Sequence, residues 1–276
     1  MEKFFIGEAC GSQRSALRRL GYPYVMINYA TKTNKPWQGI KELFVDCGGY
    51  SFFYKTGEYT TSDSHYIGYV LKWKPAYFAL RDYPCEPELL ARWGRTVVEH
   101  QQRTLEKHLR LLELVDERGV WRYSEPVAVL QGWTLEDYLR CYDMMAAHGV
   151  LTRIRYVAIG TLCRRGQEAT IRKIITGIRR SLPKKYKLHG FGIKISSLRY
   201  KDVYDALYSA DSCAWGLKER KNGCCTVKGQ YELLLEFVAK LEKIKRIHEG
   251  QTLLEAIKRR KCRSFCRSEE ESDEPP

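Results

Sequence analysis

The chain has 276 residues, of which 44% are hydrophobic, and this apolar share excludes a wholly disordered protein. Its 47 lysines and arginines outnumber its 33 acidic residues, and the net charge of +14 favours nucleic acid over an anionic membrane surface as partner. No apolar run approaches the roughly 18 residues of a membrane-spanning helix. No secretory signal is visible, so we expect a cytoplasmic protein whose ten cysteines are reduced thiols or metal ligands.

Short apolar runs alternate with helical patterns along most of the chain. The predicted strands are Phe4–Gly7, Tyr24–Tyr29, Leu43–Asp46, Tyr77–Asp82, Val127–Gln131, Val157–Gly160, Leu188–Ile193 and Ser209–Trp215. The predicted helices cover residues 12–20, 62–74, 87–118, 134–148, 167–181, 199–207 and 229–247. Eight strands alternating with helices predict an α/β fold, a TIM-like (β/α)8 barrel, although a doubly wound open sheet fits the same rhythm.

Pattern and charge divide the chain into three predicted parts. Residues 1–223 form the barrel, as a single domain. Residues 224–267 form a short C-terminal helix and a basic extension that packs on the barrel. Residues 268–276 contain five acidic residues and no basic one, so we expect a disordered acidic tail.

Polar or glycine-containing segments end several of the predicted strands: Asp46–Gly49, Asp82–Pro84, Gln131–Gly132 and Gly160–Thr161. In a barrel these ends lie on one rim, where active sites form. An aspartate before glycine or proline is by itself as often a turn residue. Asp211 is different, because it lies within a small, apolar strand, where an unpaired acid is costly.

Six segments occur in an order that resembles the tRNA-guanine transglycosylase superfamily: FVDCGGYSFF, RDYPCEP, VAVLQGWTLEDYLRC, VAIGTLCRRG, LHGFGIK and SADSCAWGL. They are closer to its DNA-modifying branch, the deazapurine DNA-modification (DpdA-like) proteins. The resemblance implies a TIM-like barrel, which agrees with the independent strand count. It also implies exchange of guanine in DNA for a 7-deazaguanine of the 7-cyano-7-deazaguanine type, through a covalent aspartyl-glycosyl intermediate.

The resemblance also implies a role for individual residues. It makes Asp211 the catalytic nucleophile and Asp46 the general acid and base. Asp82 is implied to accept hydrogen bonds from N1–H and the exocyclic amine of guanine. The other residues of the implied base-binding site bind O6, keep the pocket floor low or stack on the base: Gln131, Gly132, Gly48, Gly49, Gly160, Thr161 and Phe191. Core packing is the commoner role of an aromatic residue such as Phe191.

Basic residues at the same rim are candidates for contacts with phosphates, against the ordinary role of a solvated surface. They are Arg164, Arg165, Lys194, Lys218 and Arg220. The exchange replaces one N-glycosidic bond with another, so no ATP or redox cofactor is expected. Relatives in the superfamily often hold a structural zinc, and the candidate ligands here are Cys224, Cys225, His248, Cys262 and Cys266. Their irregular spacing disfavours this site.

DNA is the expected polymer, because no tRNA-binding appendage is evident. The resemblance leaves open a need for partner modification proteins. Three alternatives stay open: the same exchange on tRNA, a catalytically silent nucleic-acid-binding barrel, and a glycosidase in which water resolves the intermediate. The presence of Asp46, Asp82, Gln131 and Asp211 argues against the silent barrel. Cys47 replaces the serine that usually follows the first aspartate.

Overall fold

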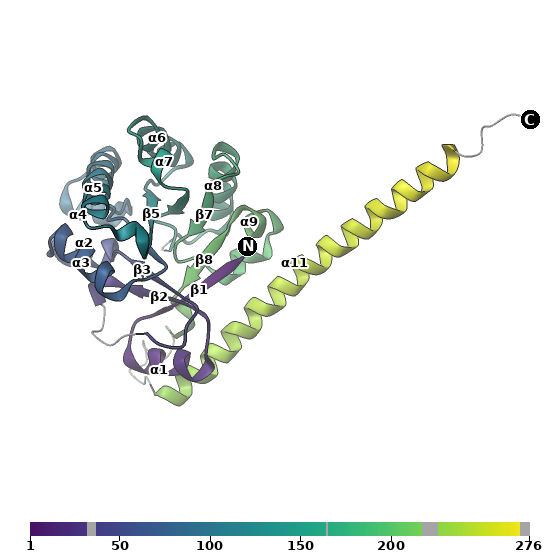
Figure 1. Ribbon diagram of the computed structural model, residues 1–276, viewed down its shortest axis with the longest axis horizontal. Coiled ribbons are helices and arrows are strands. Elements are labelled where there is room, and N and C mark those ends of the chain that lie inside the picture. The colour runs from purple at the N-terminus through teal and green to yellow at the C-terminus, as the bar shows by residue number, and fades with distance from the viewer. Residues whose placement is uncertain (32–36, 164, 217–225, 271–276) are drawn as a thin grey trace, which may run out of the picture. The chain divides into compact units, whose positions relative to one another are not determined.

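Figure 1 shows the computed structural model of the protein. It describes residues 1–31, 37–163, 165–216 and 226–270, and side chains only up to residue 250, without that of residue 249. The chain divides into two compact units, Met1–Leu234 and Leu235–Pro276. The first unit contains all the strands that the structure describes. That residues 224–267 pack on the barrel stays a prediction.

Eight parallel strands close into a barrel in chain order, which confirms the predicted fold and excludes the open sheet. The strands are β1 Lys3–Glu8, β2 Tyr24–Asn28, β3 Glu42–Asp46, β4 Tyr77–Ala79, β5 Glu125–Leu130, β6 Tyr156–Ile159, β7 Lys187–Gly190 and β8 Ser209–Ser212. β1 pairs with β2 and with β8, and Phe5 lies opposite Asp211 in the second pairing. The carboxyl ends of all eight strands therefore meet at one mouth.

Helices surround these strands (Figure 1). They are α1 Gly11–Leu20, α2 Gly49–Thr56, α3 Asp63–Trp73, α4 Pro87–Trp93, α5 Val97–Glu117, α6 Leu135–Ala147, α7 Val150–Arg153, α8 Glu168–Ser181 and α9 Lys201–Ala206. Their sequences explain how they cover the barrel. In α8, for example, the isoleucines at 171, 174, 175 and 178 form one buried stripe, as the helical period requires.

The prediction of one helix over residues 87–118 was wrong, because α4 and α5 are separate helices. Gly94 ends α4 in the left-handed conformation, with φ of 61°, which favours glycine. Thr96 and Glu99 then form a capping box that begins α5. Helix α2 was also missed. It begins directly after the turn at Gly48, so the two glycines end a strand and begin a helix.

Aromatic side chains fill much of the barrel interior, where branched aliphatic residues are usual. Phe5 contacts Phe44 with ring centroids 5.4 Å apart, and Tyr77 contacts Tyr156 at 5.1 Å, both edge to face. The ring of His189 lies 5.0 Å from that of Phe44 in the same cluster. The hydroxyls of Tyr77 and Tyr156 and the ring nitrogens of His189 are therefore polar groups within an otherwise aromatic interior.

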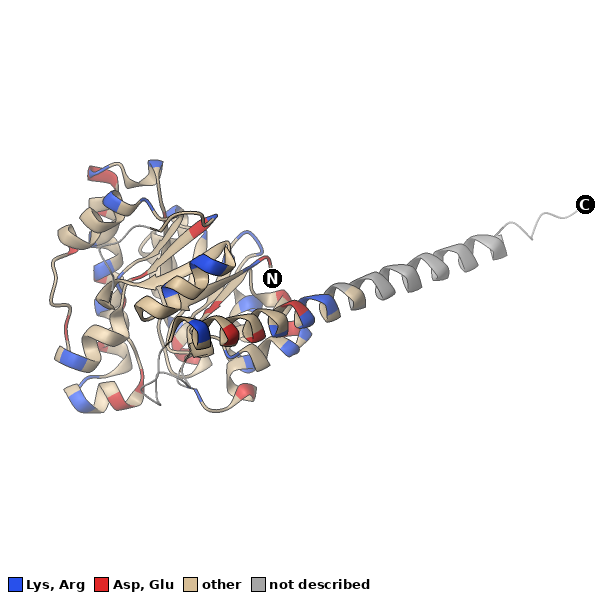
Figure 2. Cartoon of the chain, turned by 90° about the horizontal axis from the view of Figure 1, so that it is seen from below, with Lys and Arg blue, Asp and Glu red and all other residues tan. Residues whose placement is uncertain are grey.

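Helix α11 runs from Val227 to Glu270, well beyond the predicted range of 229–247, and includes the first residues of the predicted tail. Residues 271–276 lie outside the part of the chain that the structure describes. Both basic and acidic residues occur along the part of α11 with described side chains (Figure 2). Among the residues searched, no helix is long and apolar enough to cross a membrane.

Candidate active site

Asp46 is the last residue of β3 and lies half-buried at the barrel mouth. Its Oδ2 accepts a hydrogen bond of 2.8 Å from the side-chain amide of Asn28, and its Oδ1 accepts one of 3.2 Å from the backbone N–H of Gly48. Gly48 has a φ of 79°, and a Cβ there would lie 2.8 Å from Ala30. Only glycine fits this turn, which brings the backbone N–H onto the carboxylate.

The pKa of Asp46 is raised from 3.8 to about 7. Burial is the main cause, and the negative charges of Asp82 and Asp211 add to it, while the hydrogen bond from Gly48 acts in the opposite direction. This carboxyl group can therefore both give and take a proton near neutral pH. The effect of both other aspartates on Asp46 also means that three strand ends distant in sequence contribute to one site.

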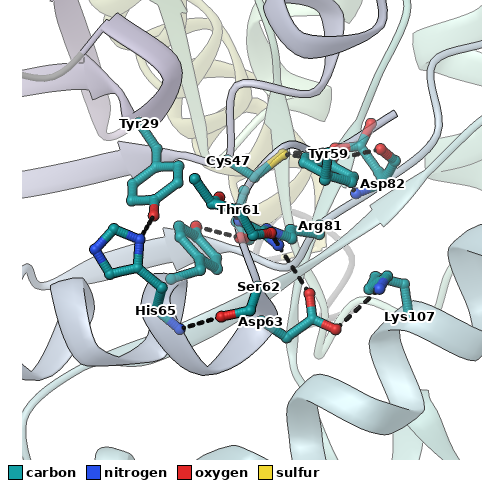
Figure 3. Close-up of polar contacts among 12 residues, drawn as sticks. Tyr29, Cys47, Tyr59, Thr61, Ser62, Asp63, His65, Arg81, Asp82 and Lys107 are labelled. Atoms are coloured by element: carbon teal, nitrogen blue, oxygen red, sulfur yellow. Dashed lines mark hydrogen bonds and ion pairs between the residues drawn. The ribbon is translucent and has the colours of Figure 1, made fainter. Parts of the chain in front are cut away.

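Asp82 follows β4, in a buried loop that the sequence had assigned to the strand. Its Oδ1 accepts a hydrogen bond of 2.9 Å from the Cys47 thiol, and its Oδ2 accepts one from the side-chain amide of Gln131 (Figure 3 shows Cys47 and Asp82). Burial raises the pKa of Asp82, and these two donors oppose that shift. Each oxygen of a carboxylate has two acceptor sites, so both can still accept from a ligand.

Arg81 lies in the same loop, next to Asp82 in sequence, and anchors this loop (Figure 3). It is fully buried and donates to the carbonyl of Thr61 at 2.7 Å and to Oδ1 of Asp63 at 2.9 Å. The hydroxyl of Tyr59 donates to the carbonyl of Asp82 at 2.6 Å. Sequence reasoning assigned no role to Arg81, although an arginine next to Asp82 was the signal. These contacts hold the backbone of Asp82 in position.

Gln131 and Thr161 join the ends of β5 and β6. The hydroxyl of Thr161 lies 2.6 Å from Oε1 of Gln131 and accepts a hydrogen bond of 3.1 Å from the backbone N–H of Cys85. Thr161 has a φ of 54°, which is rare for a β-branched residue. A Cβ on Gly160 would overlap the amide of Gln131, so a larger residue there would displace that amide. These predicted residues therefore come together beside Asp82.

Glu86 is a buried acid to which the sequence analysis gave no role. Its Oε2 lies 3.2 Å from the hydroxyl of Thr161, and the side chain is only 2% exposed. Burial, with a further contribution from the charge of Asp82, raises its pKa from 4.5 to about 7. The segment RDYPCEP contained it, but nothing in that pattern shows that the glutamate turns inward.

Asp211 lies in β8, with its side chain buried. Its Oδ1 accepts a hydrogen bond of 2.8 Å from the backbone N–H of Gly192, and Nε2 of His189 lies 3.3 Å from the same oxygen. Gly192 has a φ of 61°, and a Cβ there would overlap that of Cys163. The loop after β7 thus presents a backbone donor to the acid on β8. His189 had been noted only as part of the LHGFGIK segment.

Three other predicted base-site residues pack against neighbouring residues. Phe191 is half-buried, and its ring lies edge to face with that of His189 at 4.6 Å. Gly132 allows close packing on α6, because a Cβ there would lie 2.7 Å from the Cβ of Asp137. Gly49 lies next to the carbonyl of Asp82, 3.1 Å from a Cβ built on it. Stacking of Phe191 on a base stays a prediction.

The structure gives Arg165 a position different from the predicted phosphate contact. The side chain is buried, with 5% exposed, and its Nε donates to the carbonyl of Thr161 at 2.9 Å. The guanidinium lies over the ring of Trp133 at 4.1 Å and donates to the hydroxyl of Tyr138 at 3.3 Å. These partners come from three segments, so Arg165 holds the loops of the site together.

Lys194 is exposed, and its ammonium donates to the carbonyl of Gly166 at 3.2 Å. It therefore fits a contact with phosphate better than Arg165 does. Arg164, Lys218 and Arg220 lie outside the described residues, so their predicted contacts stay predictions.

The predicted zinc ligands lie in or near the C-terminal helix. Cys224 and Cys225 fall outside the described residues, as do the side chains of Cys262 and Cys266. His248 belongs to α11. Within the described part of the chain there is no group of three or more histidine, cysteine or acidic side chains that could hold a metal ion. The zinc site stays a prediction.

Comparison with known proteins identifies the family. The model of the family DpdA, DeoxyPurine in DNA protein A, matches residues 3–267. No curated protein matches the chain. The match covers the whole barrel and all six segments that resemble this family. It carries with it a transglycosylase role in DNA modification, and it shows that the chain belongs to the DpdA family.

Proposed function

We propose that this protein exchanges guanine in DNA for a 7-deazaguanine, of the 7-cyano-7-deazaguanine type, through a covalent bond between Asp211 and the deoxyribose. The observation that carries the proposal is the convergence of Asp46, Asp82, Gln131 and Asp211 at one barrel mouth in a chain of the DpdA family. An isolated aspartate at a strand end would support only a turn. Three neighbouring aspartates, with an amide that donates to one of them, support chemistry on a base.

In the first half-reaction, a carboxylate oxygen of Asp211 attacks C1′ and the bond from C1′ to N9 of guanine breaks. The electron pair of that bond leaves with guanine, which takes up a proton. Asp46 is the proposed proton donor, because its pKa of about 7 leaves a substantial protonated fraction at neutral pH. The product is an aspartyl ester of the sugar, as in a retaining glycosidase.

In the second half-reaction, N9 of the incoming 7-deazaguanine attacks C1′ and displaces the carboxylate of Asp211. Asp46, now ionised, takes the N9 proton. One N-glycosidic bond replaces another, and the enzyme returns to its initial protonation state. The exchange therefore balances with no ATP and no redox cofactor.

Asp82 and Gln131 are proposed to select the base. Cys47 and Gln131 each donate to one oxygen of Asp82, and one acceptor site stays on each oxygen for N1–H and the exocyclic amine of guanine. The second hydrogen of the Gln131 amide is then available for O6. Adenine presents an amine at position 6 and no N1–H, so it would leave Asp82 without its donors.

DNA is the proposed polymer because the family is a DNA-modification family and the chain is basic, with a net charge of +14. The target nucleotide has to leave the helical stack, because the catalytic groups are buried at the barrel mouth and a paired base cannot reach them. A need for partner modification proteins that open the duplex stays open.

The test follows labelled guanine. Purified protein is incubated with duplex DNA carrying labelled guanine, and in parallel with tRNA, each with and without 7-cyano-7-deazaguanine. Release from DNA that depends on the added base is the expected result, together with loss of release in Asp211→Asn and a sugar adduct on denatured wild-type protein. Release from tRNA alone would overturn the choice of polymer. Release without the added base would indicate hydrolysis, and no release would exclude this chain as a self-sufficient enzyme.

A further inference from the structure

We infer that His189 is a positioning residue that fixes the orientation of the nucleophile and leaves one defined oxygen of Asp211 to attack. The inference rests on the proposed function of Asp211 and adds a second residue to it. Neither the family match nor the sequence pattern assigns a role to His189. A series of buried polar contacts passes through the interior of the barrel and ends at Asp211.

Four residues on three strands form this series of hydrogen bonds. The hydroxyl of Tyr156, at the start of β6, makes a short hydrogen bond with Oγ of Ser209 on β8. The same Oγ lies 2.6 Å from Nδ1 of His189 on β7. On the other side of the ring, Nε2 lies 3.3 Å from Oδ1 of Asp211. Tyr156, His189 and Ser209 are completely buried, so water does not replace these partners.

Counting donors and acceptors shows which residue donates to which in this series of hydrogen bonds. Ser209 has one hydroxyl proton. Among the described residues, the hydrogen-bond partners of its oxygen are Tyr156 and His189. If Tyr156 donates to Ser209, and Ser209 donates to Nδ1, then Nε2 carries the ring proton and points it at Asp211. Every proton then has an acceptor. If Nδ1 carried a proton, one of the two hydroxyl protons would have no acceptor in the described part of the interior.

This direction has a consequence for Asp211. Its Oδ1 accepts from His189 and also from the backbone N–H of Gly192 at 2.8 Å. No described residue donates to Oδ2. The two donors therefore occupy Oδ1 and set the plane of the carboxylate, and Oδ2 is the oxygen with lone pairs directed at C1′. A carboxylate that could rotate would offer its lone pairs in that direction for only part of the time.

Aromatic rings hold the imidazole in place. The ring centroid of Phe191 lies 4.6 Å from that of His189, and that of Phe44 lies 5.0 Å away. Phe5 lies further off, at 6.3 Å. The ring cannot turn without moving these neighbours. The Nε2 proton is thus aimed by packing as well as by Ser209, which is what a positioning residue requires.

The first part of the test compares variants. His189→Leu keeps the size of the side chain and removes the donor, whereas His189→Gln keeps an amide donor near the position of Nε2. We expect His189→Leu to lower kcat for guanine release about 100-fold or more with little change in KM for DNA, and His189→Gln to restore about tenfold of that loss. Ser209→Ala should lower kcat about tenfold, because the imidazole of His189 can then adopt either tautomer. Equal rates in wild type and His189→Leu, at matched Tm, would overturn the inference.

The second part needs no activity. With ¹⁵N-labelled histidine, long-range ¹H–¹⁵N spectra distinguish the two tautomers, and loss of one signal in His189→Gln assigns it among the six histidines. We expect the Nε2–H tautomer in wild-type protein and a mixture in Ser209→Ala. A stable Nδ1–H tautomer in wild type would overturn the inference even if exchange occurs. An inactive wild type that holds the Nε2–H tautomer would instead count against the proposed function.

Discussion

The hydroxyl of Thr161 lies 2.6 Å from Oε1 of Gln131, and this contact decides which end of the amide faces Asp82. A hydroxyl that donates to Oε1 keeps the oxygen on its own side, so the amide nitrogen meets the carboxylate of Asp82. Reversal of the amide would place two oxygens against each other. The hydrogen-bonding direction of the proposed base-binding site therefore depends on a hydroxyl in the loop after β6.

Removal of that hydroxyl is expected to impair recognition of the base. In Thr161→Val, Oε1 of Gln131 loses the hydroxyl donor that orients its amide, and the backbone N–H of Cys85 loses its acceptor. We predict that guanine release falls about tenfold and that unfolding becomes easier by about 1–3 kcal/mol. Thr161→Ser keeps the hydroxyl and is the matched control. A Val variant with the rate of the Ser variant would show that the hydroxyl does not orient the amide.

Asp82→Ala tests selection of the base separately from binding of the polymer. The variant loses the acceptor for N1–H and the exocyclic amine, so release of guanine should fall about 100-fold or more. Its Kd for duplex DNA should stay within about twofold, because base contacts supply little of the nonspecific affinity. Hypoxanthine at the target position lacks the exocyclic amine. Wild type should release it more slowly than guanine, whereas the variant should treat the two alike. A large loss of DNA affinity in Asp82→Ala would argue against base recognition.

The raised pKa values predict how stability depends on pH. The carboxyl groups of Asp46 and Glu86 have pKa values of about 7 in the folded protein and ordinary values of 3.8 and 4.5. Between about pH 4 and pH 7 the folded protein binds protons that the unfolded chain has lost, so stability falls as pH rises through this window. Asp46→Asn and Glu86→Gln should raise Tm at pH 8 by about 3 °C or more, and change it less at pH 5.

Glu106→Gln is the control for this experiment, because it removes an exposed carboxylate on α5, away from the site. The difference in Tm shift between the two pH values should be larger for Asp46→Asn and Glu86→Gln than for this control. Thermal unfolding followed by circular dichroism at pH 5 and pH 8 is sufficient. If Asp46→Asn and Glu86→Gln shift Tm equally at both pH values, these two carboxyl groups do not hold protons in the folded protein.

Arg165 and Lys194 are expected to differ, although both were candidates for phosphate contacts. Arg165→Ala removes a buried guanidinium that bonds to Thr161 and stacks on Trp133, so it should destabilise the protein by about 2–3 kcal/mol. The slope of log K against log salt for DNA binding should barely change. Lys194→Ala should leave Tm unchanged and reduce that slope by about one. A reduced slope in Arg165→Ala, with Tm unchanged, would show that Arg165 contacts the phosphates of DNA.

The sequence predicted the barrel well because its evidence was periodic and repeated: each strand is a short apolar run followed by a polar or glycine-containing end. Asp46 and Asp82 were recognisable because they stand at such ends. The roles of Glu86 and His189 were not recognisable, since burial and hydrogen-bond partners come from segments far away in the chain. The burial of Arg165 was not recognisable either, because an arginine that bonds to Thr161 and Tyr138 and stacks on Trp133 cannot be distinguished from an exposed one in sequence.

The backbone of Thr161 has a consequence for engineering. A threonine with a φ of 54° holds strain on the order of 1–3 kcal/mol, which glycine would relieve. Loss of the hydroxyl costs a free energy of similar size, so glycine or asparagine at position 161 should change the Tm little. A screen for heat resistance would therefore retain such variants, and we expect them to accept the wrong bases, because the hydroxyl that orients Gln131 is gone. Fidelity should be assayed in every clone that such a screen retains.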